Sequence, residues 1–261
     1  MDLVPLALVG LAAAAAYVTS IWLLSVAMRN ASIIDIFWGP GFVLLTLVYA
    51  LLSDDGIADR QWLVTALVVV WGLRLGIHIF TRNAGHGEDY RYQKMRENAG
   101  DAFWWRSLFT VFFLQGVLLW IIAWPLLVAV QSDEPDGLRV TDYIGAGVWV
   151  IGFSFEAIGD FQLAMFKNNP ANDGKVMDGG LWRYTRHPNY FGDATLWWGY
   201  FIISAGTGWG LLTVFSPALM TFLLLRVSGV AMLERTIKRR RPEYEAYERR
   251  TSAFIPLPPK R

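Results

Sequence analysis

The sequence has no cysteine among its 261 residues. Disulfide bonds, thiolate metal sites and cysteine nucleophiles are therefore excluded. The GxGxxG and P-loop patterns, the HExxH zinc pattern and the nucleophile elbow of α/β-hydrolases are absent too. The three histidines, His78, His86 and His187, are too far apart in the sequence to predict a metal site. If the protein uses a cofactor, the chain binds it without the motifs of the common soluble folds.

Charged residues are also scarce, at 17% of the chain, whereas soluble domains typically carry roughly 25%. Hydrophobic residues make up 54%, and apolar runs recur at about the 20-residue length of a membrane-spanning helix. We predict an all-α, polytopic membrane protein with one membrane-embedded domain of seven transmembrane helices, whose substrate half covers about 1–130 and whose cofactor half covers about 142–261. The predicted spans are 3–28, 33–52, 61–81, 107–130, 142–166, 189–205 and 208–233.

The distribution of Lys and Arg predicts the orientation of these spans. If the N-terminus lies outside, only Arg60 and Arg139 of the 23 Lys and Arg residues fall in external segments, and Arg74 falls within the third span. The remaining cations then lie inside, as the positive-inside rule requires. We therefore expect a cytoplasmic C-terminus, in a bacterial inner membrane, with the functional site in the cytoplasmic loops and the inner halves of the helices.

Ionisable residues within the predicted spans mark either functional sites or pairs that hold the bundle together. Asp35 stands near the start of the second span, among Ile, Phe and Trp residues. Arg74 and His78 are four residues apart on the third span and share a helix face, as do Glu156 and Asp160 on the fifth. Two carboxylates on one face repel each other, so this last pair needs a partner that its own helix does not provide.

A cationic loop rich in turn residues follows the fifth span and ends in RYTRHPNYFGD, residues 183–193. Its Lys and Arg side chains suit phosphates, and the neighbouring Asp, Glu and Asn suit ribose hydroxyls or a carboxamide. The pattern therefore suggests a nucleotide cofactor, although the positive-inside rule alone also places cations here. The basic tail from residue 234 either lies on anionic lipid or docks as a lid over the cofactor.

The segment GGLWRYTRHPNYFGD, residues 179–193, resembles the C-terminal signature of the steroid 5α-reductase-like membrane proteins, in their bacterial DUF1295 branch. NASIIDIFWG (30–39), WGLRLGIHIFTRN (71–83), EDYRY (88–92) and RRPEYEAYERRTSAFIP (240–256) resemble that branch as well, so the similarity covers nearly the whole chain. The shorter RHPxYxG pattern is also similar to isoprenylcysteine and phospholipid methyltransferases and to sterol reductases.

The resemblance implies a seven-helix enzyme that uses NADPH to reduce a carbon–carbon double bond conjugated to a ketone, as in a 3-oxo-Δ4-steroid 5α-reductase-type reaction. The catalytic pair of the steroid enzymes is a Glu on the second helix and a Tyr on the third. In this chain Asp35 is the counterpart of the Glu, and Trp71 falls near the position of the Tyr. We expect Asp35, Arg74 and His78 to be catalytic and Trp38 and Trp71 to bind substrate. The expected cofactor residues are Glu156, Asp160, Lys167, Arg183, Arg186, His187, Asn189, Tyr190, Asp193 and Arg226.

The chemistry of such a reduction explains why an acid is needed. Hydride addition to an enone builds negative charge on the carbonyl oxygen, which a preorganised donor stabilises. A carboxylic acid donates only when it is protonated, and apolar surroundings raise its pKa. Asp35 is therefore the expected donor, with Arg74 or His78 as a second.

Three functions are compatible with these features. The first is an NADPH-dependent reductase of a steroid-like or other lipid enone, the second an S-adenosylmethionine-dependent methyltransferase of a lipid or a prenylated thiol, and the third a non-catalytic lipid-binding protein. The three phosphates of NADPH require several cations, whereas a sulfonium prefers carboxylates. The cationic loop and the intramembrane Asp35 favour the reductase. We expect membrane lipid and an apolar small molecule as partners, and no nucleic acid.

Overall fold

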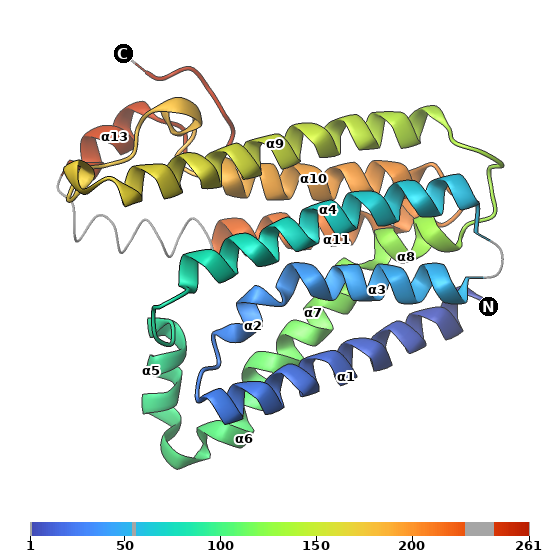
Figure 1. The fold of residues 1–261 in the computed structure, drawn as a ribbon. Coiled ribbons are helices and arrows are strands. Elements are labelled where there is room, and N and C mark those ends of the chain that lie inside the picture. Colours follow the sequence, from blue (N-terminus) through green and yellow to red (C-terminus); the bar gives the residue numbers. More distant parts are fainter. Residues whose placement is uncertain (1, 54–55, 228–242, 261) are drawn as a thin grey trace. The chain divides into compact units, whose positions relative to one another are not determined.

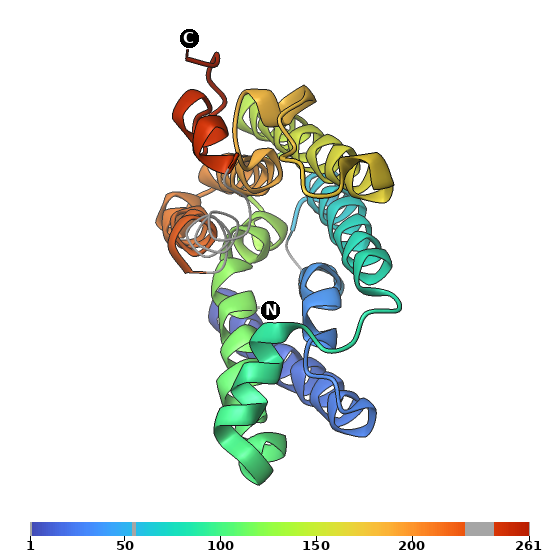
Figure 2. The ribbon, with the colours of Figure 1, turned by 90° about the vertical axis from the view of Figure 1, so that its left-hand side faces the viewer.

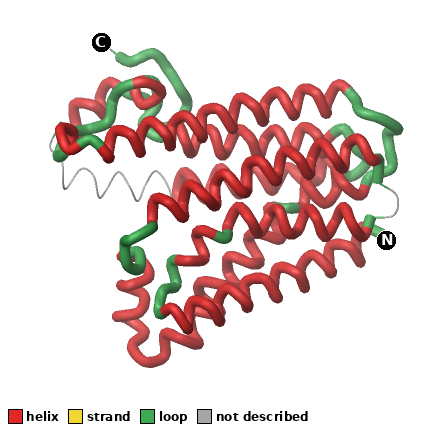
Figure 3. The backbone as a smooth tube through the Cα atoms, in the orientation of Figure 1, coloured by secondary structure: helices red, strands yellow, loops and turns green. Residues whose placement is uncertain are grey.

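The computed structural model of the chain describes residues 2–53, 56–227 and 243–260. Regular structure within these residues is helical, and their single β-bridge, between Thr185 and Ser252, belongs to no strand (Figure 3). The all-α prediction is confirmed. The chain divides into two compact units, of which unit 1 comprises Met1–Arg139 and Gly206–Thr213, and unit 2 comprises Val140–Ala205 and Val214–Arg261.

Unit 1 contains long apolar helices and several short segments that join them (Figure 1). From Tyr90 to Ile122 the helical backbone is continuous, but it changes from α-helix to short 3₁₀ and π-helical turns and back. The elements are α1 (Leu3–Met28), α2 (Ile33–Ile36), α3 (Trp38–Leu52), α4 (Ala58–Asn83), α5 (Tyr90–Ala99), η1 (Gly100–Ala102), α6 (Phe103–Ser107), η2 (Leu108–Phe113), α7 (Leu114–Ile122) and α8 (Trp124–Gln131).

Unit 2 is built on two long helices, α9 and α10, that lie side by side in both views of the ribbon (Figures 1 and 2). Proline begins the second of them, at Pro188, where its fixed φ suits the first helical turn and its missing N–H removes no hydrogen bond. The elements are α9 (Val140–Asn168), η3 (Pro170–Asn172), η4 (Gly180–Arg183), α10 (Pro188–Ala205), α11 (Phe215–Phe222), η6 (Leu223–Val227) and α13 (Tyr244–Arg250), and η5 (Gly210–Val214) joins the two units.

Five helices among the described residues are long and apolar enough to cross a membrane, which indicates an integral, multi-pass membrane protein. They are Leu3–Met28, Ala58–Asn83, Tyr90–Ile122, Val140–Asn168 and Gly210–Val227. Of the other two predicted spans, the second corresponds to the shorter apolar helix Trp38–Leu52 and the sixth to α10. The last predicted span continued to residue 233, and its positions 228–233 lie outside the described residues. Seven spans and their orientation stay predictions.

Glycines set the distance between α9 and α10. Gly145 of α9 faces Gly199 of α10, and Gly152 of α9 faces Gly192 of α10. Within each helix the two glycines are seven residues apart. A Cβ at Gly152 would lie 2.5 Å from the backbone nitrogen of Leu196 and 2.6 Å from the carbonyl oxygen of Gly192. The two helices therefore touch backbone to backbone, as small residues allow in membrane proteins.

In unit 1, a buried apolar cluster holds α2 and α5 against α1 and η2. Ile33 and Ile34 of α2 lie in it with Tyr92 of α5, and Val18 and Phe112 contribute from α1 and η2. Van der Waals contacts between such closely packed side chains stabilise the arrangement. Because the cluster includes residues directly before Asp35 as well as Tyr92, it brings the short helix α2 and the start of α5 together.

Candidate functional site

Asp35 lies in α2, outside the five candidate spans, and both of its carboxyl oxygens bind side chains of α5. The Tyr92 hydroxyl donates to Asp35 Oδ1 at 2.6 Å, and Arg91 Nη2 donates to Asp35 Oδ2 at 2.8 Å. Hydrogen bonds this short that involve a charged partner are among the stronger ones in proteins. The structure thus places an acid, a phenol and a guanidinium in one cluster, which we call the Asp35 cluster.

The loop before α5 explains why Arg91 and Tyr92 reach Asp35. Asp89 caps this helix, accepting hydrogen bonds from the Arg91 backbone N–H and from Arg91 Nε, both at 2.9 Å. The Asp89 N–H donates to Ser32 Oγ at 3.3 Å, and Glu88 Oε1 accepts from the Ala31 N–H at 2.6 Å. These bonds tie the segment before α2 to the start of α5.

The two carboxyl groups around Arg91 differ in their acidity. The Asp35 side chain is 19% exposed, and its burial raises the pKa of its carboxyl group, against the opposing effects of the Arg91 charge and the Tyr92 hydrogen bond. Burial acts on Asp89 in the same direction, but the hydrogen bonds and the charge of Arg91 outweigh it and lower the pKa of Asp89. Of the two, Asp35 is therefore the carboxyl group that holds a proton more readily.

The other residues predicted for this half lie in α3 and α4. Arg74 and His78 are partly buried on α4, and both have interaction partners. Trp38 begins α3 and contacts the Phe42 ring edge-on at 5.3 Å, and Trp71 is fully buried with its ring 5.6 Å from the same Phe42. Trp71 therefore belongs to the packed core of unit 1.

A second polar group lies where α9 and α10 touch. Asn189 Nδ2 donates to Asp160 Oδ1 at 3.0 Å, and Glu156 and Asp160 are both buried. Asn189 Oδ1 is buried as well and has no hydrogen-bond partner among the described residues. Asp193 follows Asn189 by four residues on α10 and so lies on the same helix face. A buried acceptor beside carboxylates suits a ligand that brings N–H or O–H donors.

The predicted cationic residues of this half differ in exposure. Arg183 is exposed on η4, Lys167 is exposed near the end of α9 and has an interaction partner, and Arg226 is exposed in η6. His187 is buried, and its ring stacks on that of Tyr190 with 5.6 Å between centroids and 7° between planes. Arg183, Lys167 and Arg226 are therefore the exposed cations among these predicted residues, whereas His187 is packed against Tyr190.

Arg186 was predicted to face phosphates, but its guanidinium binds the C-terminal segment. The residue is only 8% exposed. Its Nη1 donates to the carbonyl oxygens of Thr251 at 2.7 Å and Glu248 at 3.1 Å, and its Nη2 lies 3.8 Å from Glu248 Oε1. Arg186 thus binds the backbone of the last turn of α13 and of the residue that follows it.

Residues 243–260 dock on the loop between α9 and α10, on which α13 lies in Figure 1. The two alternatives for the tail, contact with anionic lipid and a lid over a cofactor, stay predictions, and 234–242 lie outside the described part. Burial raises the pKa of Tyr247, so its hydroxyl stays a donor at neutral pH. The contacts are the Tyr247 hydroxyl to the Trp182 carbonyl, Leu257 N–H to the Tyr184 carbonyl, Thr185 hydroxyl to the Phe254 carbonyl, and the Arg250–Asp178 ion pair.

Replacing Arg186 with Gln should release this docked segment, because the buried carbonyls would lose charge-assisted donors worth about 1.5 to 3 kcal/mol each. Limited proteolysis followed by mass spectrometry should then cut within 243–260 at least about tenfold faster. The exposed Arg183, replaced with Gln, serves as the control and should leave the cleavage rate unchanged. Equal cleavage rates for Arg186→Gln and the unaltered chain would show that Arg186 does not hold this segment in place.

The family of the chain follows from sequence comparison. The sequence model of the family described as "Protein of unknown function (DUF1295)" matches residues 21–251, which include both the Asp35 cluster and the Asp160–Asn189 pair. The chain belongs to the DUF1295 family. A curated Schizosaccharomyces pombe (strain 972) protein, described as uncharacterized, is 24% identical over 264 residues, covering 90% of this chain and 75% of that protein. No solved structure matches this DUF1295 protein.

Sequence reasoning missed Arg91 and Tyr92 as members of a site. Both stand in EDYRY, which resembles the DUF1295 branch but by itself indicates no role for these two residues. A signal was present, because Asp89 is a favourable N-cap and predicts a helix that starts with Tyr90. The pattern did not indicate that this helix contacts Asp35.

Proposed function

We propose that this DUF1295 protein is a membrane-embedded, NADPH-dependent reductase of the C=C bond of an enone lipid, with Asp35 and Tyr92 as its proton-donating pair. The observation that carries the proposal is the 2.6 Å hydrogen bond between the Tyr92 hydroxyl and Asp35 in apolar surroundings. An acid paired with a tyrosine is the arrangement that the family resemblance implies, with α5 rather than Trp71 contributing the tyrosine.

The pair suits activation of a ketone. Tyr92 would donate its hydroxyl proton to the substrate carbonyl oxygen, where negative charge builds as the β-carbon gains a hydride. Protonated Asp35 would donate in turn to the Tyr92 oxygen, and Arg91 on the second carboxyl oxygen would fix the orientation of the acid. The resulting enol gains a proton from solvent at its α-carbon, while its O–H proton returns to the Tyr92 oxygen and the Tyr92 proton returns to Asp35, and the saturated ketone results.

The hydride of this reaction would be supplied by bound NADPH. The unpaired Asn189 Oδ1 and the Asp160 carboxylate fit the N–H and O–H donors of a carboxamide or a ribose. Exposed Arg183 and Lys167 would meet the phosphates, since guanidinium and ammonium groups bind them with charge-assisted hydrogen bonds. With the positive-inside distribution of Lys and Arg, we place these residues on the cytoplasmic side.

The test uses the full chain purified in detergent. We expect it to bind NADPH and to convert it to the oxidised nucleotide in step with reduction of an enone, with a 3-oxo-Δ4-steroid and a long-chain acyclic enone as probes. Mass spectrometry of the product should show the gain of two hydrogens. Protein that binds no nicotinamide nucleotide but binds S-adenosylmethionine would overturn the proposal in favour of a methyltransferase.

Replacing Arg183 with Ala should weaken NADPH binding more than NADH binding if this guanidinium binds the 2′-phosphate. One lost charge-assisted contact predicts about a tenfold increase in the NADPH dissociation constant. Isothermal titration with both nucleotides measures the difference. Arg249, an exposed cation on α13, is the matched control. Equal increases for the two nucleotides would remove the 2′-phosphate role from Arg183.

A further inference from the structure

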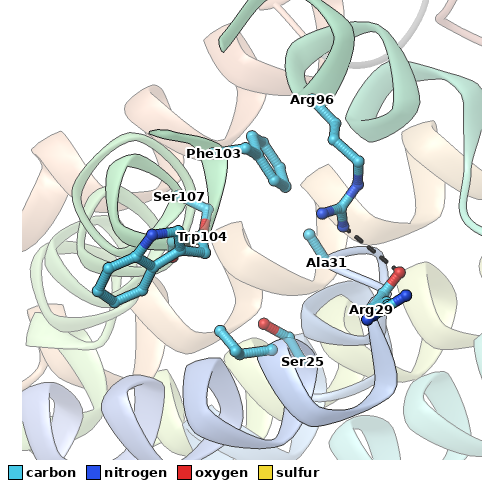
Figure 4. A pocket seen from close by; sticks show the side chains of 8 residues that line it. Ser25, Arg29, Ala31, Arg96, Phe103, Trp104 and Ser107 are labelled. Carbon is cyan, nitrogen blue, oxygen red and sulfur yellow. Dashed lines mark hydrogen bonds between the residues drawn. The ribbon is translucent and has the colours of Figure 1, made fainter. Parts of the chain in front are cut away.

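Unit 1 contains a cavity of about 210 Å³ that the proposed reaction does not use (Figure 4). Its lining includes two arginines, Arg29 and Arg96, and the aromatic residues Phe103 and Trp104. Ser25 and Ser107 also line it, but their hydroxyls donate to carbonyls of their own helices, those of Trp22 and Trp104. The guanidinium groups are therefore the donors that the cavity offers.

The charges around the cavity leave one cation unbalanced. Arg96 donates to both oxygens of Glu88, at 2.9 and 3.0 Å, and its guanidinium lies 4.4 Å from the centre of the Phe103 ring. It also donates to the Arg29 carbonyl oxygen at 3.4 Å. The Arg29 side chain is exposed, and no ion pair or hydrogen bond of its guanidinium is found among the described residues. Two guanidiniums and one carboxylate leave a net charge of +1.

The backbone at Arg29 has a conformation that disfavours a side chain. Arg29 ends α1 with φ 51° and ψ 37°, the left-handed conformation. A residue with a Cβ loses roughly 1 to 2 kcal/mol there, which is why glycine is preferred at such helix ends. Among the described residues, no other non-glycine residue has a positive φ. The helix dipole favours a cation at the end of α1. It does not explain why Arg29 lines a cavity.

Apolar and aromatic groups continue from the cavity along α1. Trp22 stacks on Trp104, with 6.4 Å between ring centroids, and donates to its carbonyl oxygen at 2.8 Å. Tryptophan concentrates at the level of lipid headgroups. Val26 lines the cavity, and Leu23, one turn earlier on the span, is 58% exposed. A free anion would leave these surfaces unused, whereas a lipid would cover them.

We propose that this cavity binds the phosphate of an anionic phospholipid, with Arg29 and Arg96 donating to its oxygens and the acyl chains lying along α1 past Val26 and Leu23. A phosphodiester carries one negative charge, which balances the net charge of the cavity. Phosphatidylcholine adds a cation of its own, so a headgroup such as phosphatidylglycerol is bound in preference to it. The site is separate from the Asp35 cluster and does not depend on the proposed reductase activity.

Native mass spectrometry of the full chain in detergent tests the site, with phosphatidylglycerol and phosphatidylcholine of identical acyl chains as probes. Arg29→Gly removes the cation and relieves the left-handed backbone, so the fold should be kept. We expect it to weaken phosphatidylglycerol binding at least about fivefold, while Arg29→Lys changes it less than about twofold. Arg106→Gln is the matched control, because this exposed cation of α6 lies outside the cavity. It should bind the lipid like the unaltered chain.

Three results would overturn the proposal. Arg29→Gly that binds phosphatidylglycerol as tightly as the unaltered chain removes Arg29 from any lipid site. An equal loss of phosphatidylglycerol affinity in Arg106→Gln shows that the lipid binds to surface cations in general and not to this cavity. Displacement of the lipid by inorganic phosphate at equal concentration shows a site for free anions instead. If Arg29→Gly does not fold, Arg29→Gln is measured in the same assay against the same criteria.

Discussion

Replacing Tyr92 with Phe should lower the turnover of an enone substrate by about 10²- to 10³-fold, the usual effect of removing one donor to a developing oxyanion. The substitution keeps the buried ring in its apolar cluster and removes only the hydroxyl that donates to Asp35 at 2.6 Å. NADPH binding should be unchanged, because the proposed cofactor residues belong to α9, α10 and the loop between them. Single-turnover rates at saturating NADPH, with nucleotide titrations alongside, separate the two effects.

The control is Tyr90→Phe, which removes a hydroxyl from a tyrosine of the same helix that is 58% exposed. It should react at the unaltered rate. Asp35→Asn should lower turnover at least about tenfold, since the amide has no acidic proton to pass to the Tyr92 oxygen. The double variant should be little slower than Tyr92→Phe, because groups that act as a unit are not additive. Unchanged turnover in Tyr92→Phe would remove the pair from the reaction.

The apolar runs predicted the five helices that are long and apolar enough to cross a membrane, and they drew attention to Asp35, but they did not reveal the residues that Asp35 contacts. Asp35 was recognisable because a carboxyl group within a hydrophobic segment conflicts with its surroundings. Tyr92 stands in the polar segment EDYRY, where a tyrosine does not conflict with its surroundings. It meets Asp35 across 57 residues of sequence, through the capping of α5 by Asp89 and the burial of Ile33 and Ile34. Residue periodicity describes one helix at a time and does not report such a contact.

Charge alone also did not reveal what Arg186 binds. A guanidinium donates equally well to a phosphate or to a backbone carbonyl, so a cationic loop does not distinguish the two. The structure supplies the acceptors, the carbonyl oxygens of Glu248 and Thr251, from a segment more than 60 residues later. Arg183, three residues earlier, remains exposed. Arg183 and Arg186 therefore have different surroundings, although the same motif predicts cofactor binding for both.

The sequence also contains a regular spacing of glycines. Gly145, Gly152 and Gly159 recur every seven residues along α9, and Gly192 and Gly199 do so along α10. Such spacing keeps small residues on one face of a helix, where another backbone can approach. It predicts a close pair of helices, and this pair carries Glu156, Asp160, Asn189 and Asp193.

Replacing Gly152 with Ala should therefore disrupt unit 2 more than the addition of one methyl group suggests. The new Cβ would lie 2.5 Å from the backbone nitrogen of Leu196 and 2.6 Å from the Gly192 carbonyl oxygen. Backbone atoms cannot rotate away as a side chain does, so α9 and α10 must separate. Overpacking of this kind costs about 1 to 3 kcal/mol or more. The expected result is a lower midpoint of thermal unfolding in detergent.

Gly147→Ala is the matched control, because it adds the same methyl group to the same helix where nothing lies within 4 Å. That change should be neutral or stabilise the helix by up to about 1 kcal/mol. Gly152→Ala should also weaken ligand binding, since separation of the helices moves Asp160 away from Asn189. If both variants unfold at the same temperature, close glycine contacts do not hold the helices together. If Gly152→Ala unfolds early yet binds its ligand normally, the Asp160–Asn189 pair does not bind that ligand.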